Sequence, residues 1–313
     1  MQVLNRQDVY EFHRPLEQFW SGPIASGFCP NPEYLDLLYQ QPAVLANLST
    51  EHWGDNDYPM CVYMHDVTQK HQNMIILSHN PDHDQLRPNI FYFPFWLRRS
   101  QTWLSLRRFS LPIDMRRHYL SCICFRPRAH RIRMLREIHE AGLDHDAEIV
   151  MPDHQECEPF HDAADQAFWQ NYCDIESRKF DLWDIDWPPY TNAWLQIVLE
   201  SSWHDGIFLT EKTWKCIAAG QFFVMLAGRD SVKHIHELGF DTFHDIIPHY
   251  LYDGLSGYQA RCTAIISVLH DLRDLDWADV YHTTRQRRQH NRELLLSGKV
   301  YQPYIQKFES FLQ

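Results

Sequence analysis

The chain has 313 residues, of which 44% are hydrophobic and 22% are charged, values typical of a globular protein large enough for two domains. Its 41 acidic residues outnumber its 29 basic ones, and the net charge of −12 disfavours binding to the phosphate backbone of nucleic acids. The apolar runs have only strand length and the first residues are polar. We therefore expect no membrane span, no signal peptide, and a cytoplasmic protein whose eight cysteines are reduced.

The first 112 residues have the pattern of a small α/β domain. Residues 35–48 have a helical pattern, and short apolar runs at 74–77 and 89–95 predict strands separated by a polar loop. Pro112 and the polar residues that follow it indicate a boundary. The first domain is therefore expected to span residues 1–112.

A second α/β domain is expected over residues 113–285, followed by a helical tail over 286–313. An apolar run at 119–125 predicts its first strand, and the segment after it predicts an amphipathic helix. The side chains expected on the buried side of that helix are Ile132, Leu135, Ile138 and Leu143. Further elements are predicted as a strand at 149–151 and helices at 232–238 and 260–272.

The most informative stretch runs from residue 193 to residue 243 and predicts a β-α-β unit. Its first strand, at 195–199, ends at the carboxylate of Glu200. Thr210 stands at the N-cap position of a helix that Gly220 ends, and a second strand follows at 222–226. The polar groups thus gather at one edge of the predicted sheet. That edge is where α/β proteins bind ligands, and a helix amino terminus beside a lysine suits phosphate.

This stretch resembles the donor-binding motif of α1,3-fucosyltransferases, which is roughly E-N-S, a short spacer, Y-[IV]-T-E-K and an A-G-x-x-P-V-V-L strand. It is more similar to shorter fucosyltransferase-like glycosyltransferases of bacteria and phages, which read F-[IL]-T-E-K-T-W-K-x-I-A-A-G. The matching residues here read ESS at 200–202, FLTEKTWK at 208–215 and AAG at 218–220. Ser201 replaces the family's Asn, a phenylalanine stands in place of the proline, and the spacer is one residue longer. The Ser at position 201 argues against fucose as the donor sugar more than it argues against binding of a nucleotide sugar.

The resemblance implies a GT-B-like fold, in which two Rossmann-like domains face a cleft and a C-terminal helix crosses back to the first domain. The second domain would bind a nucleotide diphosphate sugar, and the first would bind a glycan or another hydroxyl acceptor. An S-N-x-x-x-x-x-R pattern of the family places its arginine at Arg131, although Phe125 stands where the Asn would fall. Arg128 is the alternative if the junction between strand and helix is shifted.

The resemblance also assigns roles within the motif. Glu211 would contact the ribose hydroxyls and Lys212 a donor phosphate, while Glu200 would lie near the sugar and base. Asn291 matches a late Asn of the short relatives. The donor-binding residues expected from the motif, its cap and its neighbours are Arg128, Arg131, Glu200, Thr210, Glu211, Lys212, Lys215 and Asn291. Lys215 also has the spacing to pair with Glu211.

By resemblance, the reaction inverts the anomeric centre in one displacement and needs no metal or other cofactor. It requires a base for the acceptor hydroxyl, and that base should lie in the first domain. Asp82 is preferred because it follows the end of a predicted strand, and the other candidates are Asp66, Asp84 and Glu51. Two metal-site patterns are weaker: a cluster in SHNPDHDQ (residues 78–85), and the pair Asp184 and Asp186, which no strand precedes.

Two other classes of function stay open. One is a DNA-modifying glycosyltransferase that acts on hydroxymethylated bases, which the net charge of −12 disfavours. The other is a non-catalytic protein that binds nucleotides or carbohydrates on the same fold.

Overall fold

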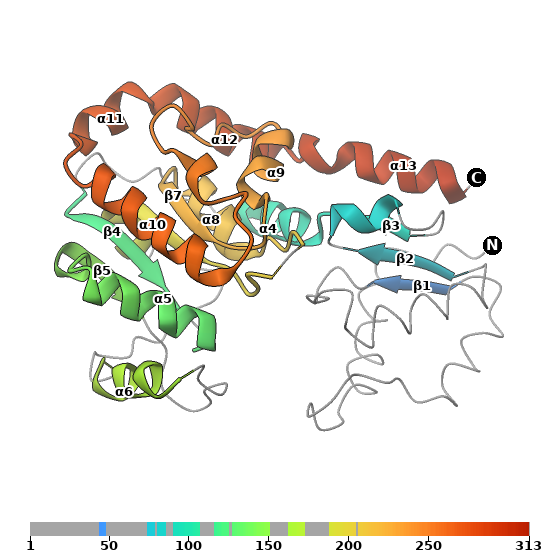
Figure 1. Cartoon of the computed structure of the whole chain (residues 1–313). Helices are drawn as coiled ribbons and strands as arrows, with labels where there is room; N and C mark the ends of the chain where they lie inside the picture. Colours follow the sequence, from blue (N-terminus) through green and yellow to red (C-terminus); the bar gives the residue numbers. More distant parts are fainter. Residues whose placement is uncertain are drawn as a thin grey trace. The chain divides into compact units, whose positions relative to one another are not determined.

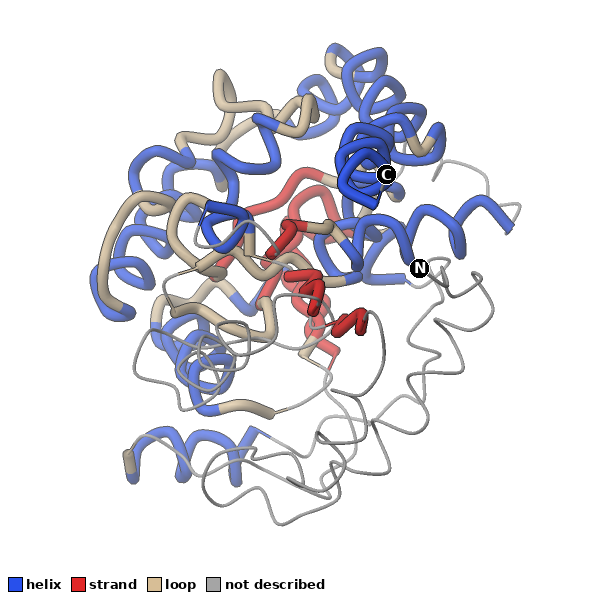
Figure 2. The backbone as a smooth tube through the Cα atoms, turned by 90° about the vertical axis from the view of Figure 1, so that its right-hand side faces the viewer, coloured by secondary structure: helices blue, strands red, loops and turns tan. Residues whose placement is uncertain are grey.

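The computed structural model divides the chain into two compact units, Met1–Pro94 and Phe95–Gln313. The structure describes residues 44–47, 74–78, 80–85, 90–106, 116–124, 127–150, 162–172, 188–204 and 206–312. Figures 1 and 2 draw the described residues in colour and the other residues in grey.

The described part of the first unit contains a three-stranded parallel sheet in the order β1-β2-β3. Its elements are β1 (Val44–Asn47), β2 (Met74–Ser78), the 3-10 helix η1 (Pro81–Gln85) and β3 (Ile90–Tyr92). Strands β2 and β3 confirm the two predicted strands. The helix predicted over 35–48 is wrong at β1, because Val44 pairs in parallel with Met74. Pairing with a distant segment here overrides the local pattern.

The second unit contains a four-stranded sheet in the order β5-β4-β6-β7, in which every neighbouring pair is parallel. Its strands are β4 (His118–Ile123), β5 (Ala147–Val150), β6 (Ala193–Leu199) and β7 (Phe222–Leu226). Each confirms a strand predicted from an apolar run. Such runs suit a parallel sheet, whose two faces are both covered.

The second unit also contains helices. They are α4 (Phe95–Leu106), α5 (Ala129–Glu140), α6 (Ala163–Tyr172), α7 (Pro188–Thr191), α8 (Glu211–Ala218), α9 (Ser231–Glu237), α10 (Tyr258–Leu272), α11 (Trp277–Thr283), α12 (Arg285–Ser297) and α13 (Gln302–Leu312), with 3-10 helices η2 (Asp144–Asp146), η3 (His249–Leu251) and η4 (Lys299–Tyr301). The stripe predicted for α5 is confirmed, since Ile132, Leu135 and Ile138 are buried on it and Leu143 is buried after it.

The strand order creates a reversal between β4 and β6. From β4 the chain crosses through α5 to β5 on one side, and from β6 it crosses through α8 to β7 on the other side. Because such crossovers are right-handed, the two helices cover opposite faces of the sheet. In agreement, α10 packs against α5 and β7, whereas α4 and α12 pack against α8 (Figure 1). The crevice at such a reversal is where doubly wound sheets bind ligands.

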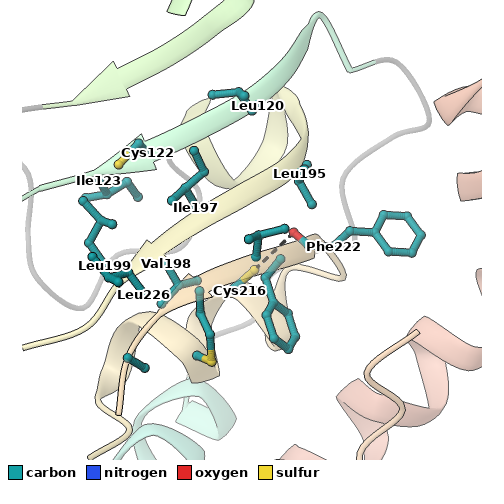
Figure 3. Close-up of a cluster of buried hydrophobic side chains, with 14 of the residues drawn as sticks. Leu120, Cys122, Ile123, Leu195, Ile197, Val198, Leu199, Cys216, Phe222 and Leu226 are labelled. Atoms are coloured by element: carbon teal, nitrogen blue, oxygen red, sulfur yellow. Dashed lines mark hydrogen bonds between the residues drawn. The ribbon is translucent and has the colours of Figure 1, made fainter. Parts of the chain in front are cut away.

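The core of the second unit lies on both faces of the sheet. Figure 3 shows Leu120, Ile197 and Phe222 on three adjacent strands, and none of the three has any exposed surface. From the helix side, Cys216 of α8 packs onto β7, where its thiol donates to the carbonyl of Phe222 at 3.7 Å. This contact holds the C-terminal end of α8 against the first residue of β7.

The division of the chain differs from the predicted boundary near residue 112. Helix α4 belongs to the second unit because it packs against α8 and α12. The predicted separate tail over 286–313 likewise belongs to this unit, through α12 and α13. None of the helices in the described ranges has the length and apolar composition needed to cross a membrane.

Candidate functional site

The site is built around Glu200, the first residue after β6. Its side chain has no exposed surface. One carboxylate oxygen accepts from the backbone N–H of Thr210 at 2.9 Å and from the hydroxyl of Thr213 at 2.6 Å. The other accepts from the hydroxyl of Thr210 at 2.5 Å and from the N–H of Ser201 at 3.3 Å. Glu200 therefore ties the end of β6 to the first turn of α8.

This arrangement changes the role expected of Thr210. Thr210 stands at the N-cap position with an extended backbone, as predicted, but its hydroxyl makes no capping bond to the helix backbone. That hydroxyl instead donates to Glu200 and accepts from the ammonium of Lys212 at 2.9 Å. A carboxylate at the amino end of a helix is stabilised by the helix dipole. The carboxylate of Glu200 thus supplies the negative charge at the amino end of α8. Direct contact between Glu200 and a sugar stays a prediction.

The first turn of α5 brings a second group of side chains to the same edge. Arg131 is buried, and its Nε donates to the backbone carbonyl of Glu200 at 3.2 Å. His130 Nε2 donates to the same carbonyl at 3.1 Å. Burial, with Arg131 adjacent, lowers the pKa of His130 to about 3, so its imidazole is neutral. Of these two side chains, only Arg131 carries a positive charge.

Three cations from two helix amino ends meet at Ser201. Arg131 Nη2 donates to its hydroxyl at 3.3 Å, and Lys212 Nζ lies 3.5 Å from the same oxygen. Arg128, the predicted alternative to Arg131, donates to the carbonyl of Ser201 at 2.5 Å. Arg128 and Arg131 thus both contact Ser201, and a phosphate role for either arginine stays a prediction. Ser201 is also the position at which the resembling family has Asn.

The acidic and basic side chains of α8 form a buried pair. Glu211 and Lys212 are each about one-twentieth exposed, and Lys212 Nζ donates to Glu211 Oε1 at 3.3 Å. Burial raises the pKa of Glu211, but the ammonium of Lys212, with a smaller contribution from Lys215, lowers it more, and the net pKa lies below its usual value. Lys215 is buried, and its ammonium lies 5.0 Å from the centre of the Tyr190 ring. Glu211 is therefore held as a carboxylate.

Asn291 on α12 has a different environment. Its Oδ1 accepts from the backbone N–H of Asp241 at 2.7 Å, and its Nδ2 donates to the carbonyl of the same residue at 2.7 Å. The side chain of Asp241 is in turn paired with Arg287. Asn291 thus holds the loop after α9, and its contact with a donor stays a prediction.

The candidate bases of the first unit are only partly described. Asp82 on η1 is exposed, and its backbone N–H donates to Asn80 Oδ1 at 3.1 Å. Asp84 Oδ1 accepts from the N–H of Tyr92 at 3.0 Å and so links η1 to β3. Glu51, Asp66, Asp184 and Asp186 lie outside the described residues. Within the described ranges, no three His, Cys, Asp or Glu side chains are grouped as a metal site would require.

Two features at this edge escaped the sequence analysis. Arg261 on α10 is buried, and its guanidinium donates to the carbonyls of Ala227, Trp203 at 2.9 Å and Leu255 at 2.6 Å. Its helical register could have revealed it, because Arg261 precedes Ile265, Val268 and Leu272 on their apolar stripe. The second feature is Trp203, two residues after Ser201 in the motif itself.

Comparison with known proteins adds no relative. Neither a scan against protein-family models nor a search of curated protein sequences found a match to the chain.

Proposed function

We propose that the protein is a glycosyltransferase that binds a nucleotide diphosphate sugar at the carboxyl edge of the β4–β6–β7 sheet. One observation carries the proposal: Arg128, Arg131 and Lys212 converge on Ser201 from helix amino ends separated by a strand reversal. A diphosphate is the ligand that such a group suits best, because it accepts hydrogen bonds from cations and from free helix N–H groups together.

The charges of the neighbouring side chains support a phosphate ligand. Lys212 and Lys215 accompany the two arginines, whereas the buried acids here are Glu200 and Glu211. Glu200 uses both carboxylate oxygens within the protein. Its bonds to Thr210 and Thr213 orient the first turn of α8, so it acts as a positioning residue. Glu211 is ionised and suits the hydroxyls of a ribose.

These roles describe stabilisation of a leaving group. As the glycosidic bond to the diphosphate breaks, negative charge grows on the phosphate oxygens, and cations held in place beforehand stabilise it without reorganising. In a GT-B arrangement the acceptor and its base would be supplied by the first unit. Asp82 is the base we propose, because it is exposed and follows β2.

The binding step is tested by titration calorimetry with uridine and guanosine diphosphates and with the matching nucleosides. Lys212→Met keeps much of the side-chain volume and removes the charge. It should weaken diphosphate binding roughly 10- to 100-fold, the loss expected for a charge-assisted hydrogen bond, and leave nucleoside binding unchanged. Lys233→Met is the matched control, since Lys233 lies exposed on α9. Equal losses for diphosphate and nucleoside would refute the phosphate role of Lys212.

The catalytic step is tested by incubating the protein with nucleotide sugars and measuring release of free diphosphate, with and without glycan acceptors. Release that depends on an acceptor supports a transferase. Nucleotide binding without release under any condition would instead favour the non-catalytic binding protein. Transfer to hydroxymethylated DNA, and not to glycans, would favour the DNA-modifying alternative.

A further inference from the structure

A stack of aromatic side chains lies beside the cation group, on the loop that follows β6. The ring centres of Trp203 and His204 are 4.3 Å apart with an interplanar angle of 31°. Tyr258 of α10 meets Trp203 edge-on, with ring centres 5.1 Å apart. Trp203 is partly buried against the core, whereas His204 is exposed. The stack therefore has an inner end that is packed and an outer end that faces solvent.

The backbone that carries the stack is held from several sides. The carbonyl of Trp203 accepts from Arg261 at 2.9 Å, and the N–H of His204 donates to the hydroxyl of Ser202 at 3.3 Å. Gly228, after β7, lies so close that a Cβ there would fall 2.9 Å from the carbonyl oxygen of His204. The conformational entropy of this aromatic pair is lost when the protein folds, so little more is lost when a flat ligand binds.

The stack is also joined to the amino end of α5. The hydroxyl of Tyr258 donates to the carbonyl of His130 at 2.6 Å. His130 in turn contacts Glu200, and Trp203 follows Ser201 by two residues. The same short segment of chain thus carries the residue on which the cations converge and the aromatic pair.

We propose that Trp203 and His204 form the surface on which the nucleobase of the donor stacks. The inference rests on the proposed function, because a nucleoside diphosphate joins an anionic group to a flat aromatic base through one ribose. Phosphates at the Ser201 cations would leave the base within reach of the aromatic pair. Every base has a π-face, so stacking on Trp203 and His204 adds affinity for any nucleotide.

The test compares three ligands by titration calorimetry: uridine or guanosine diphosphate, inorganic pyrophosphate, and ribose 5-phosphate. Only the first contains a base. His204→Ala removes an exposed ring and should leave the folded structure intact. Trp203→Ala removes the ring that packs against His204. Each should weaken nucleoside diphosphate binding roughly 5- to 100-fold, the range expected for loss of one stacking contact. Pyrophosphate and ribose 5-phosphate should bind as tightly as to the unchanged protein.

Two further variants sharpen the result. Trp203→Phe keeps an aromatic face and should retain most of the affinity. His270→Ala removes another exposed histidine, at the far end of α10, and should change nothing. Unchanged nucleoside diphosphate binding in His204→Ala and Trp203→Ala would overturn the stacking role and leave the proposed function standing. Equal losses of affinity for nucleoside diphosphate and for pyrophosphate would likewise overturn the stacking role and leave the proposed function standing. Failure of the unchanged protein to bind any nucleoside diphosphate would overturn both.

Discussion

Replacing Glu200 by alanine should separate the first turn of α8 from the end of β6. The substitution removes the acceptor of three close hydrogen bonds, from the Thr210 N–H at 2.9 Å, the Thr210 hydroxyl at 2.5 Å and the Thr213 hydroxyl at 2.6 Å. It also removes the carboxylate 3.8 Å from the ammonium of Lys212. All four residues are buried, so water cannot easily replace the lost partner.

The expected cost is about 3–5 kcal/mol of unfolding free energy, the usual loss when one member of a buried charged group is removed. Thr213→Val removes a single donor without changing the shape of the side chain and should cost about 1.5–3 kcal/mol, because its hydroxyl bonds to a charged group. Since both changes break the same bond, the double variant should be more stable than the sum of the two losses predicts, by about 1–3 kcal/mol.

Urea unfolding followed by circular dichroism measures these free energies, and native-state hydrogen exchange measures the local effect. The Thr210 amide should lose its protection in Glu200→Ala while the amides of β6 keep theirs. Losses of Glu200→Ala and Thr213→Val that add within about 0.5 kcal/mol would refute the shared network. So would a Thr210 amide that stays protected. Glu200→Gln, which keeps the volume but loses one acceptor oxygen, should fall between the wild-type and alanine proteins.

The remaining predictions concern pH, backbone packing and the proposed base. Burial lowers the pKa of three histidines from 6.5 to about 3 or 4, and they are His130, His234 and His249. As pH falls, these histidines take up protons in the unfolded chain before they do so in the folded protein. Their contribution to the unfolding free energy should therefore be complete above pH 6.5 and should fall as pH drops toward 4. An unfolding free energy in urea titrations that does not change with pH would contradict this. Gly228→Ala would place a Cβ 1.8 Å from the carbonyl oxygen of Gly206 and should cost about 3 kcal/mol, whereas Gly254→Ala, with its nearest atom at 3.8 Å, should stay within about 0.5 kcal/mol in the same assay. Asp82→Asn should lower turnover by about 10²–10⁴-fold without weakening donor binding, and normal turnover would remove Asp82 as the base.

Several elements of the second unit could be predicted from the sequence because their signals are local. The strands at 195–199 and 222–226 are short apolar runs, and the buried stripe of α5 repeats with helical spacing. Such patterns depend only on which nearby residues share a face, and in these elements the tertiary contacts agree with them. The placement of Arg131, Glu200 and Lys212 near one edge followed from their positions, because Glu200 directly follows a strand and the two cations lie in the first turns of helices.

What those side chains do there was decided by distant contacts. No local pattern shows that Glu200 bonds to Thr213 or that Arg131 and Lys212 meet at Ser201, because each contact joins segments that only the sheet brings together. Thr210 has the predicted N-cap position, but its hydroxyl makes no bond to the helix backbone, because it donates to the buried carboxylate of Glu200 instead.

The sequence by itself determined the β-α-β unit and the gathering of polar groups at its carboxyl edge, since both follow from periodicity along the chain. Tertiary structure decided the strand order β5-β4-β6-β7, and with it the reversal between β4 and β6 where the cations meet. It also made residues 44–47 a strand and drew α4 into the second unit. Parallel pairing and helix packing join residues far apart in sequence, and their free energy exceeds the local preferences that the sequence alone reveals.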